Sequence, residues 1–326
     1  IDAAHTNGVP IVGVLGFPWG SGYGYVEQVS QFCQKAEDGS FPVADKLIEV
    51  MDYYGFDGYF FNQESYGCSE AIATRLDEMI HYMHAKRPDM LISWYDSMIS
   101  SGSVSYGDGV NSYNKIWMED DANGVRGVDE FFMNYNWTSS KIATTISTMK
   151  SIGRSQFDAF AGIDVQQNCM DTYFADHLLV DEDGIAKLSL ALYCPNSTMG
   201  LAADGAQFHE VERTFYTNAK EDPRDTSVEL SSSAWAGMSR LFADKTPITA
   251  APFVTDFNSG HGTGYYVDGA LSRDAEWSYQ SNQDVMPTWT WIIDSTGTKL
   301  AGDYDFTDAY NGGNSIKFHG NLNARN

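Results

Sequence analysis

The chain has 326 residues, 43% of them hydrophobic and 14% aromatic, which is enough to bury the core of one barrel-sized domain with a smaller module. Its 44 acidic residues outnumber its 20 basic residues, so the formal net charge is −24. This charge repels phosphate backbones and argues against nucleic acid as a partner. No apolar run reaches about 18 residues, so the sequence predicts no membrane-spanning segment.

Strand-like and helix-like patterns alternate along most of the chain. Continuous or alternating apolar runs predict strands, and apolar residues at helical spacing predict helices. The expected strands are, in chain order, 9–17, 55–61, 89–96, 129–137, 157–165 and 187–195. The expected helices are 43–54, 69–87 and 139–153. Ser69 is a suitable N-cap for the second helix, and Gly153 a suitable stop for the third.

This alternation predicts an α/β fold with right-handed crossovers and a parallel sheet. Either an open doubly wound sheet or a (β/α)8 TIM-like barrel would satisfy it. No glycine-rich phosphate-binding motif follows a strand, which removes the usual reason for the open form. Polar residues gather instead at strand carboxyl ends, where a barrel carries its active site. They are Asn62, Glu64, Tyr95, Asp96, Asn134 and Asp164.

The two ends of the chain differ from this pattern. The first residues resemble the middle of a domain, so the natural protein is expected to extend further on the N-terminal side. Beyond residue 262, short alternating runs rich in Gly, Ser and Asn replace the helical period. We therefore expect a catalytic barrel over 1–262 and a β-rich accessory module over 263–326. That module would form part of a β-sandwich, with one strand in the sequence NSIKFHG.

The strand at 55–61 runs into the sequence Asn62-Gln63-Glu64. Because side chains alternate across a strand, Gly58, Phe60, Asn62 and Glu64 share one face. In a barrel that face points inward, so Asn62 and Glu64 are expected side by side at the open end.

An acid beside an amide suits one class of chemistry. A glutamate above an aromatic layer is partly withdrawn from water, which suits a general acid. Ordinary retaining glycosidases use a second carboxylate as nucleophile, whereas a 2-acetamido sugar can supply its own carbonyl oxygen. Asn62 could orient that acetamide while Glu64 protonates the leaving oxygen. The alternative is that this tripeptide is only a capped turn at a strand end.

Segments spread along nearly the whole chain resemble glycoside hydrolase family 85, the endo-β-N-acetylglucosaminidases. They are IDAAHTNGVPIVGVLGF, FDGYFFNQES, LISWYDSM, FFMNYNW, AFAGIDV, LSLALY and PFVTDFNSGHG…QDVMPTW. The resemblance implies cleavage of the chitobiose core of N-glycans with retention, through an oxazoline intermediate, and it puts the first barrel strand upstream of Ile1. No cofactor is expected. It carries the catalytic roles to Asn62, Glu64 and Tyr95.

Further residues are expected to bind substrate. Tyr106 stands where the family often has a tryptophan over the acceptor sugar, and Asn136 replaces an aromatic residue beside the retained Trp137. These departures put acceptor-site stacking in doubt. Phe17 and Trp19 could form a stacking platform or pack in the core, while Asp96 could contact sugar or orient other groups. The complete list of expected substrate-binding residues is Phe17, Trp19, Asp96, Tyr106, Asn134, Trp137 and Asp164.

Two alternatives remain open. In a chitinase-like barrel, acids would occupy the positions of Phe60 and Asn62, which disfavours that activity. A silent sugar-binding barrel would not need the glutamate, amide and tyrosine together. The histidines lack metal-ligand spacing, so no metal is expected. The acidic surface and the trailing β-rich segment favour a secreted or cell-surface bacterial enzyme over a cytosolic one.

Overall fold

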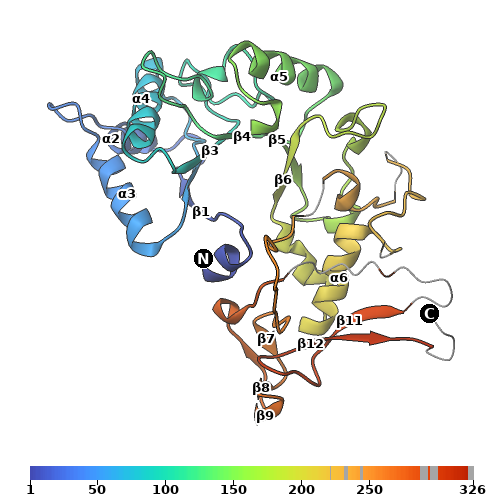
Figure 1. The fold of residues 1–326 in the computed structure, drawn as a ribbon. Coiled ribbons are helices and arrows are strands. Elements are labelled where there is room, and N and C mark those ends of the chain that lie inside the picture. Colours follow the sequence, from blue (N-terminus) through green and yellow to red (C-terminus); the bar gives the residue numbers. More distant parts are fainter. Residues whose placement is uncertain (221, 231–233, 243–244, 287–292, 294–299, 322–326) are drawn as a thin grey trace. The chain divides into compact units, whose positions relative to one another are not determined.

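The computed structural model describes residues 1–220, 222–230, 234–242, 245–286, 293 and 300–321 (Figure 1). The chain divides into two compact units, which we call the sheet unit and the mixed unit. The sheet unit comprises Ile11–Asp164 and Phe174–Tyr193. The mixed unit comprises Ile1–Pro10, Val165–Tyr173 and Cys194–Asn326, apart from the residues not described.

The sheet unit is built on six parallel strands hydrogen-bonded in chain order. They are β1 Val12–Gly16, β2 Gly58–Asn62, β3 Leu91–Tyr95, β4 Glu130–Met133, β5 Ala159–Asp164 and β6 Ser189–Tyr193. Every expected strand of this region is present. The strictly sequential order is that of a TIM-like barrel, because a doubly wound sheet reverses its order at a switch point. The expected α/β class is confirmed.

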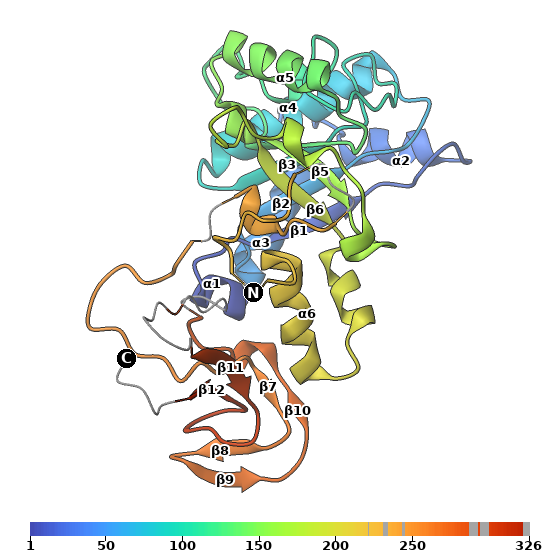
Figure 2. The same cartoon turned by 90° about the vertical axis from the view of Figure 1, so that its right-hand side faces the viewer.

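Helices connect the strands of this unit. They are α2 Tyr25–Phe32, α3 Pro42–Tyr54, α4 Glu70–Lys86 and α5 Ser139–Ser151. The last three match the expected helices closely, and α2 was not predicted. In both views α4 and α5 lie on the same side of the sheet (Figures 1 and 2). Such crossover helices bury one face of a parallel sheet.

The face of the sheet that meets the helices forms the main core. Tyr59 and Phe61 of β2 are buried there, and the Tyr59 hydroxyl donates to the Leu47 carbonyl of α3 at 2.7 Å. Trp94 of β3 stacks on Trp117 with ring centroids 3.8 Å apart. These large rings fix the register of β2 and β3, because a shift of one residue would turn them to the opposite face.

The opposite face carries a row of aromatic rings. Phe60, Tyr95 and Phe132 lie on adjacent strands with ring centroids 5.7 to 6.5 Å apart. Tyr135 continues the row 6.0 Å from Phe132, and Tyr193 lies 6.0 Å from Tyr135. The aromatic layer expected beneath the catalytic pair is therefore present.

In its described residues, the mixed unit contains two α-helices and several short antiparallel strand pairs (Figure 2). The helices are α1 Asp2–Thr6 and α6 Gly205–Thr217. The pairs are β7 His261–Gly262 with β10 Trp277–Ser278, β8 Tyr265–Val267 with β9 Ala270–Arg273, and β11 Ala301–Asp305 with β12 Ser315–His319. The strand expected in NSIKFHG is confirmed as β12.

Short 3-10 helices occur in both units. They are η1 Lys115–Trp117, η2 Gln156–Asp158, η3 Cys169–Asp171, η4 Asp176–Leu178, η5 Pro195–Leu201, η6 Met238–Arg240 and η7 Gln280–Asn282. In the described residues, no helix combines the length and apolar character needed to cross a membrane.

The boundary expected between 262 and 263 stays a prediction, as does the β-sandwich. Parts of that expected module, 287–292, 294–299 and 322–326, lie outside the described residues. The same holds for the last three residues of the segment QDVMPTW.

Candidate active site

The expected catalytic pair lies at the carboxyl end of β2. Asn62 is the last residue of the strand, and Glu64 follows after one residue. Gln63 between them is completely buried, whereas Asn62 and Glu64 are half-buried. This alternation continues the strand beyond its last assigned residue and puts Asn62 and Glu64 on the face of the aromatic row.

The loop after β1 is hydrogen-bonded along this end of β2. The Phe17 amide donates to the Asn62 carbonyl at 3.1 Å, and the Gly20 amide donates to the Glu64 carbonyl at 2.9 Å. The Ser65 hydroxyl donates to the Pro18 carbonyl at 2.6 Å. The parallel ladder therefore extends past both strands and holds the backbone of Asn62 and Glu64 in place.

The side chain of Asn62 has an unused acceptor. Its Oδ1 atom is buried and accepts no hydrogen bond from the part of the chain that the structure describes. A buried carbonyl without a donor costs about 1–3 kcal/mol, so native proteins keep few of them. Such an atom at a strand end is suited to receive an N–H group from a ligand.

The Glu64 carboxyl accepts a hydrogen bond from a tyrosine side chain. The Tyr106 hydroxyl lies 2.7 Å from Glu64 Oε1 and donates to it. Burial, followed by the hydrogen bond with Glu64, raises the pKa of Tyr106, and a hydrogen bond with Trp19 acts in the opposite direction. Trp19 itself is 70% exposed, as a stacking platform would be.

Tyr95 ends β3 beside this pair and is 9% exposed. Its hydroxyl donates to Asn134 Oδ1 at 2.7 Å. Burial, with smaller contributions from Tyr135 and the Glu64 charge, raises the pKa of Tyr95. The phenol therefore stays protonated, and its one proton is committed to Asn134.

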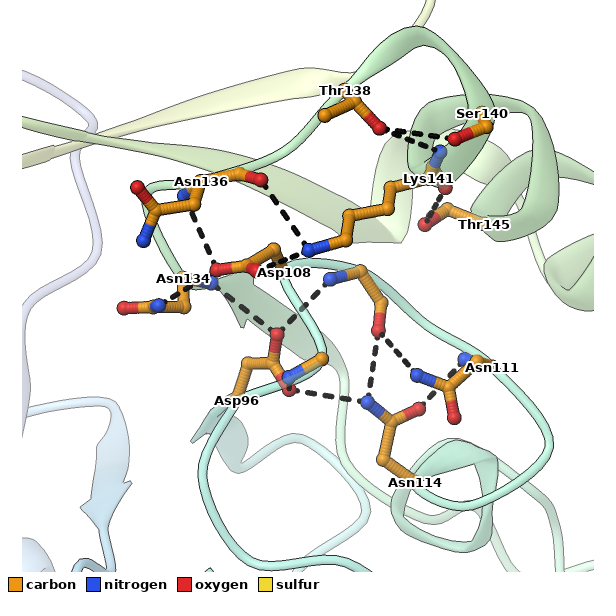
Figure 3. Close-up of polar contacts among 12 residues, drawn as sticks. Asp96, Asp108, Asn111, Asn114, Asn134, Asn136, Thr138, Ser140, Lys141 and Thr145 are labelled. Atoms are coloured by element: carbon orange, nitrogen blue, oxygen red, sulfur yellow. Dashed lines mark hydrogen bonds and ion pairs between the residues drawn. The ribbon is translucent and has the colours of Figure 1, made fainter. Parts of the chain in front are cut away.

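Asn134 is held in turn by an ion pair (Figure 3). Its Nδ2 donates to Asp108 Oδ1 at 2.7 Å, and the Asn136 amide donates to the same oxygen at 3.1 Å. Lys141 of α5 pairs with Asp108 Oδ2. The chain of contacts from Lys141 to Tyr95 fixes the orientation of the Asn134 amide.

Asp96 is 1% exposed and acts as an anchor for the loop after β3 (Figure 3). Its carboxylate accepts from the amides of Gly107 at 3.1 Å, Gly109 at 3.0 Å and Asn134 at 3.4 Å, and from Asn114 Nδ2 at 3.1 Å. Burial raises the pKa of Asp96 to about 6, and these donors oppose the shift. Of its two expected roles, this geometry supports orientation of other groups.

Three other expected residues lie at the edge of this arrangement. Phe17 packs edge-on against Phe32 of α2 with centroids 4.8 Å apart. Trp137 is 6% exposed and donates to the Gly162 carbonyl at 2.8 Å, which is a packing role. Asp164 is exposed at the end of β5, and its charge adds to the effect of burial in raising the pKa of Tyr135. Their contact with sugar stays a prediction.

Sequence reasoning missed Asp108, Asn114 and Lys141. Asp108 stands between two glycines, a pattern typical of a turn, and adopts a positive φ of 51°. Lys141 is one polar residue among many on α5. The contacts of Asp108 with Asn134 and Lys141 join segments separated by 26 and 33 positions, and that of Asn114 with Asp96 spans 18, so no local signal links the partners.

A match to a family model decides the family of the chain. The model described as Glycosyl hydrolase family 85 matches residues 1–265. The chain belongs to this family. The expected resemblance is confirmed over most of the chain, including every residue named in the site.

Solved and curated relatives agree with this assignment. The Endo-D glycoside hydrolase domain from Streptococcus pneumoniae R6 has a TM-score of 0.91 and 39% identity over 98% of this chain and 51% of that chain. Cytosolic endo-beta-N-acetylglucosaminidases from Gallus gallus and Homo sapiens are 26% and 25% identical over 98% of this chain. The chain spans 40% and 39% of their respective lengths. The likeness to the Endo-D domain supports the TIM-like fold.

The comparison also corrects one expectation. The sequence favoured a secreted or cell-surface enzyme because of its acidic surface and trailing β-rich segment. The curated relatives from Gallus gallus, Mus musculus, Danio rerio and Homo sapiens are named as cytosolic, so that prediction is wrong. Net acidity favours solubility in any compartment and therefore cannot identify one.

Proposed function

We propose that this chain carries the catalytic centre of an endo-β-N-acetylglucosaminidase. It cleaves the GlcNAc-β1,4-GlcNAc bond in the chitobiose core of N-linked glycans, with retention and through an oxazoline intermediate. The observation that carries the proposal is the buried Oδ1 of Asn62, which has no donor among the described residues, beside the half-buried Glu64 on the same face of β2. Membership of family 85 and the names of the relatives support the same activity.

The first step uses the acetamide group of the substrate as nucleophile. Its carbonyl oxygen forms a bond to the anomeric carbon while the bond to the leaving oxygen breaks, and Glu64 donates its proton to that oxygen. The acetamide nitrogen becomes positively charged and keeps its proton. Asn62 Oδ1 accepts that N–H, which aligns the acetamide and stabilises the charge as it develops.

The second step reverses the role of Glu64. A water molecule, or the hydroxyl of an acceptor sugar, attacks the anomeric carbon as its bond to the oxazoline oxygen breaks. The Glu64 carboxylate takes the proton from the attacking oxygen, and the acetamide is restored. Two displacements give a product with the β configuration.

Several aromatic and polar groups near the pair would bind the glycan. Trp19 is exposed enough to stack on a sugar ring, and Tyr95 and Asn134 form a fixed polar pair beside Glu64. In this proposal residues 1–262 form the barrel and 263–326 an accessory module. A cytosolic location, as in the names of the curated relatives, fits the proposal.

The decisive experiment is mass spectrometry of a defined N-glycopeptide treated with the protein. We expect a peptide that retains one GlcNAc and a free glycan that ends in the other. Glu64→Gln should lower the rate by about 10²–10⁴-fold, because it keeps the shape and removes the transferable proton. Near-normal turnover by this variant would exclude Glu64 as the general acid.

The same assay separates the alternatives. Cleavage of chitin oligomers in preference to the glycopeptide would indicate a chitinase-like enzyme, and binding without cleavage of either would indicate a silent barrel. Proton NMR during early turnover should detect the β anomer first. Initial release of the α anomer would mean direct attack by water and a different second catalytic group.

A further inference from the structure

Two tyrosines lie beside Glu64, and only one of them donates to it. The rings of Tyr95 and Tyr106 are 6.1 Å apart and tilted by 52°. Tyr95 gives its proton to Asn134, and Tyr106 gives its proton to Glu64 Oε1. A phenol has a single proton to donate, so these two bonds assign the tyrosines to different partners.

The loop that carries Tyr106 is fixed on both sides of that residue. On one side the Ser105 amide donates to the Ser97 carbonyl at 2.7 Å. On the other side the Gly107 amide donates to Asp96 Oδ1 at 3.1 Å. Within the loop the Ile99 amide donates to the Ser103 carbonyl at 2.9 Å, which closes a small hairpin. The Tyr106 phenol is therefore directed at Glu64 by the backbone around it.

The hydrogen bond also distinguishes the two oxygens of Glu64. An oxygen that accepts from a phenol is the carbonyl oxygen of the neutral carboxyl, so the acidic proton resides on the other oxygen, Oε2. Because Tyr106 is partly buried next to an acid, its hydroxyl stays protonated and keeps donating.

We propose that Tyr106 is a positioning residue that holds Glu64 by Oε1, keeps the catalytic proton on Oε2 and stabilises the carboxylate once that proton has left. The inference rests on the proposed function and assigns Tyr106 a role on the acid itself, in addition to contact with the acceptor sugar.

This role has opposite consequences for the two half-reactions. Cleavage of the glycan needs Glu64 protonated, and opening of the oxazoline needs it ionised. Without the phenol the ionised form loses a donor, so protonation of Glu64 should extend to higher pH. Each reaction has a pH–rate profile. In Tyr106→Phe, the pH above which glycan cleavage slows and the pH below which oxazoline hydrolysis slows should both rise. A residue that only binds sugar would change KM and leave both pH values in place.

The test measures both pH profiles for the unsubstituted protein, Tyr106→Phe and the control Tyr113→Phe. The probes are a defined N-glycopeptide and a preformed chitobiose oxazoline. We expect both pH values to rise by about one pH unit in Tyr106→Phe, the effect of one hydrogen bond to a charged group. Tyr113, which is exposed on the same loop, should leave the profiles unchanged.

A second measurement does not depend on activity. Carbon-13 NMR of protein labelled at glutamate carboxyls, with Glu64 assigned through Glu64→Gln, follows protonation of this residue directly. The Glu64 titration midpoint should lie about one pH unit higher in Tyr106→Phe. An unchanged midpoint overturns the inference even if the glycan is cleaved as proposed. A shifted midpoint in a protein that cleaves no glycan supports the contact and rejects the proposed function.

Discussion

Tyr95 donates its hydroxyl proton to Asn134 and so turns away from Glu64, although it ends the strand next to the one that carries the acid. The amide of Asn134 is held by Asp108, which Lys141 neutralises. The polar groups around the proposed reaction therefore form two sets. One set contains Tyr106 and Glu64, and the other runs from Tyr95 to α5.

The roles proposed for Asn62 and Glu64 can be separated by supplying two donors. Asn62→Ala removes the acceptor for the acetamide N–H, so glycopeptide hydrolysis should fall by about 10²-fold or more. A preformed oxazoline bypasses that step, and Glu64 can still take a proton from an acceptor hydroxyl. Asn62→Ala should therefore still join an oxazoline donor to a GlcNAc-bearing acceptor, as measured by mass spectrometry of the product.

Glu64→Ala is the matched comparison for that experiment. It should lose both reactions, because the same carboxyl acts as acid and as base. If Asn62→Ala loses the oxazoline reaction as completely as hydrolysis, Asn62 has a structural or general binding role and the division of labour is wrong.

Asp96→Asn should disorder the loop after β3. The carboxylate accepts on both oxygens, so an amide nitrogen in place of either one would face an existing donor, Gly107 at Oδ1 or Gly109 at Oδ2. Leaving these donors unpaired in a buried site should lower the free energy of unfolding by about 2 kcal/mol or more. Glycopeptide turnover should fall as well, because Tyr106 and Asn134 lose their anchor.

Urea unfolding and turnover measured on the same preparations check this prediction. Asp120→Asn, at an exposed aspartate, serves as the control and should change stability by less than about 0.5 kcal/mol. Equal effects of the two substitutions would contradict the anchoring role of Asp96.

Gly58→Ala should be among the most destabilising single changes in the sheet unit. Gly58 has a φ of 155°, and a Cβ atom there would lie 1.8 Å from the Leu91 carbonyl oxygen of β3. Since the neighbouring backbone cannot move without breaking the β2–β3 ladder, we expect a loss of about 3 kcal/mol or more.

Gly16→Ala at the end of β1 is the matched control, because a Cβ atom there meets nothing within 4 Å. Thermal unfolding should distinguish the two variants, with Gly16→Ala within about 0.5 kcal/mol of the parent. A mild effect of Gly58→Ala would mean that β2 and β3 do not approach as closely as described.

The mixed unit should lose stability in acid through His261. Its Nε2 lies 2.8 Å from His209 Nε2, so the two rings share one proton and cannot both be charged without repulsion. Burial, and then the neighbouring His209, lower the pKa of His261 to about 4. Nδ1 of His209 lies 3.4 Å from a carboxylate oxygen of Glu212.

Acid destabilises the mixed unit because the folded chain binds a proton at His261 more weakly than the unfolded chain does. The unfolded chain binds the proton near pH 6.5 and the folded chain only near pH 4, so acid favours unfolding between these values. Stability should fall as pH drops through this window, with a slope of at most about 1.4 kcal/mol per pH unit from this residue. Amide hydrogen exchange of α6 at pH 7 and pH 5 measures it. His261→Gln should flatten the response, and the more exposed His177→Gln should not; equal pH responses in all three proteins would contradict the assignment.

The elements that the sequence predicted well are those whose pattern is local. The strands around Phe61 and Trp94 read as continuous apolar runs because parallel strands are buried on both faces. The helix α6 was missed although Asp204 at its N-cap and Gln207 three residues later carry the sequence signature of a capping box. The Asp204 side chain accepts from the Gln207 amide at 2.9 Å, and the Gln207 side chain accepts at 2.6 Å from the amide of Ala203, one residue before the N-cap. That signal was present and could have been recognised.

Only part of the site could be predicted from the sequence, because some of its contacts are local and others join distant segments. Alternation along β2 puts Asn62 and Glu64 on one face, and the sequence alone is enough to derive this. The contacts of Tyr106 with Glu64 and of Asp108 with Lys141 join loops to distant elements, so they depend on how the chain folds back. Trp137 is a residue whose place in the motif was recognised but whose environment was not. Its indole is buried and donates to the Gly162 carbonyl.

The small hairpin between Ser97 and Ser105 separates the residues at its tip from the backbone that directs Tyr106. Its two backbone hydrogen bonds, Ser105 to Ser97 and Ile99 to Ser103, both lie within the hairpin, and Tyr106 is the next residue after it. Residues at its tip can be inserted, deleted or exchanged while the closing bond and the contact of Gly107 with Asp96 remain. Changes at the tip should therefore leave the contact of Tyr106 with Glu64 intact.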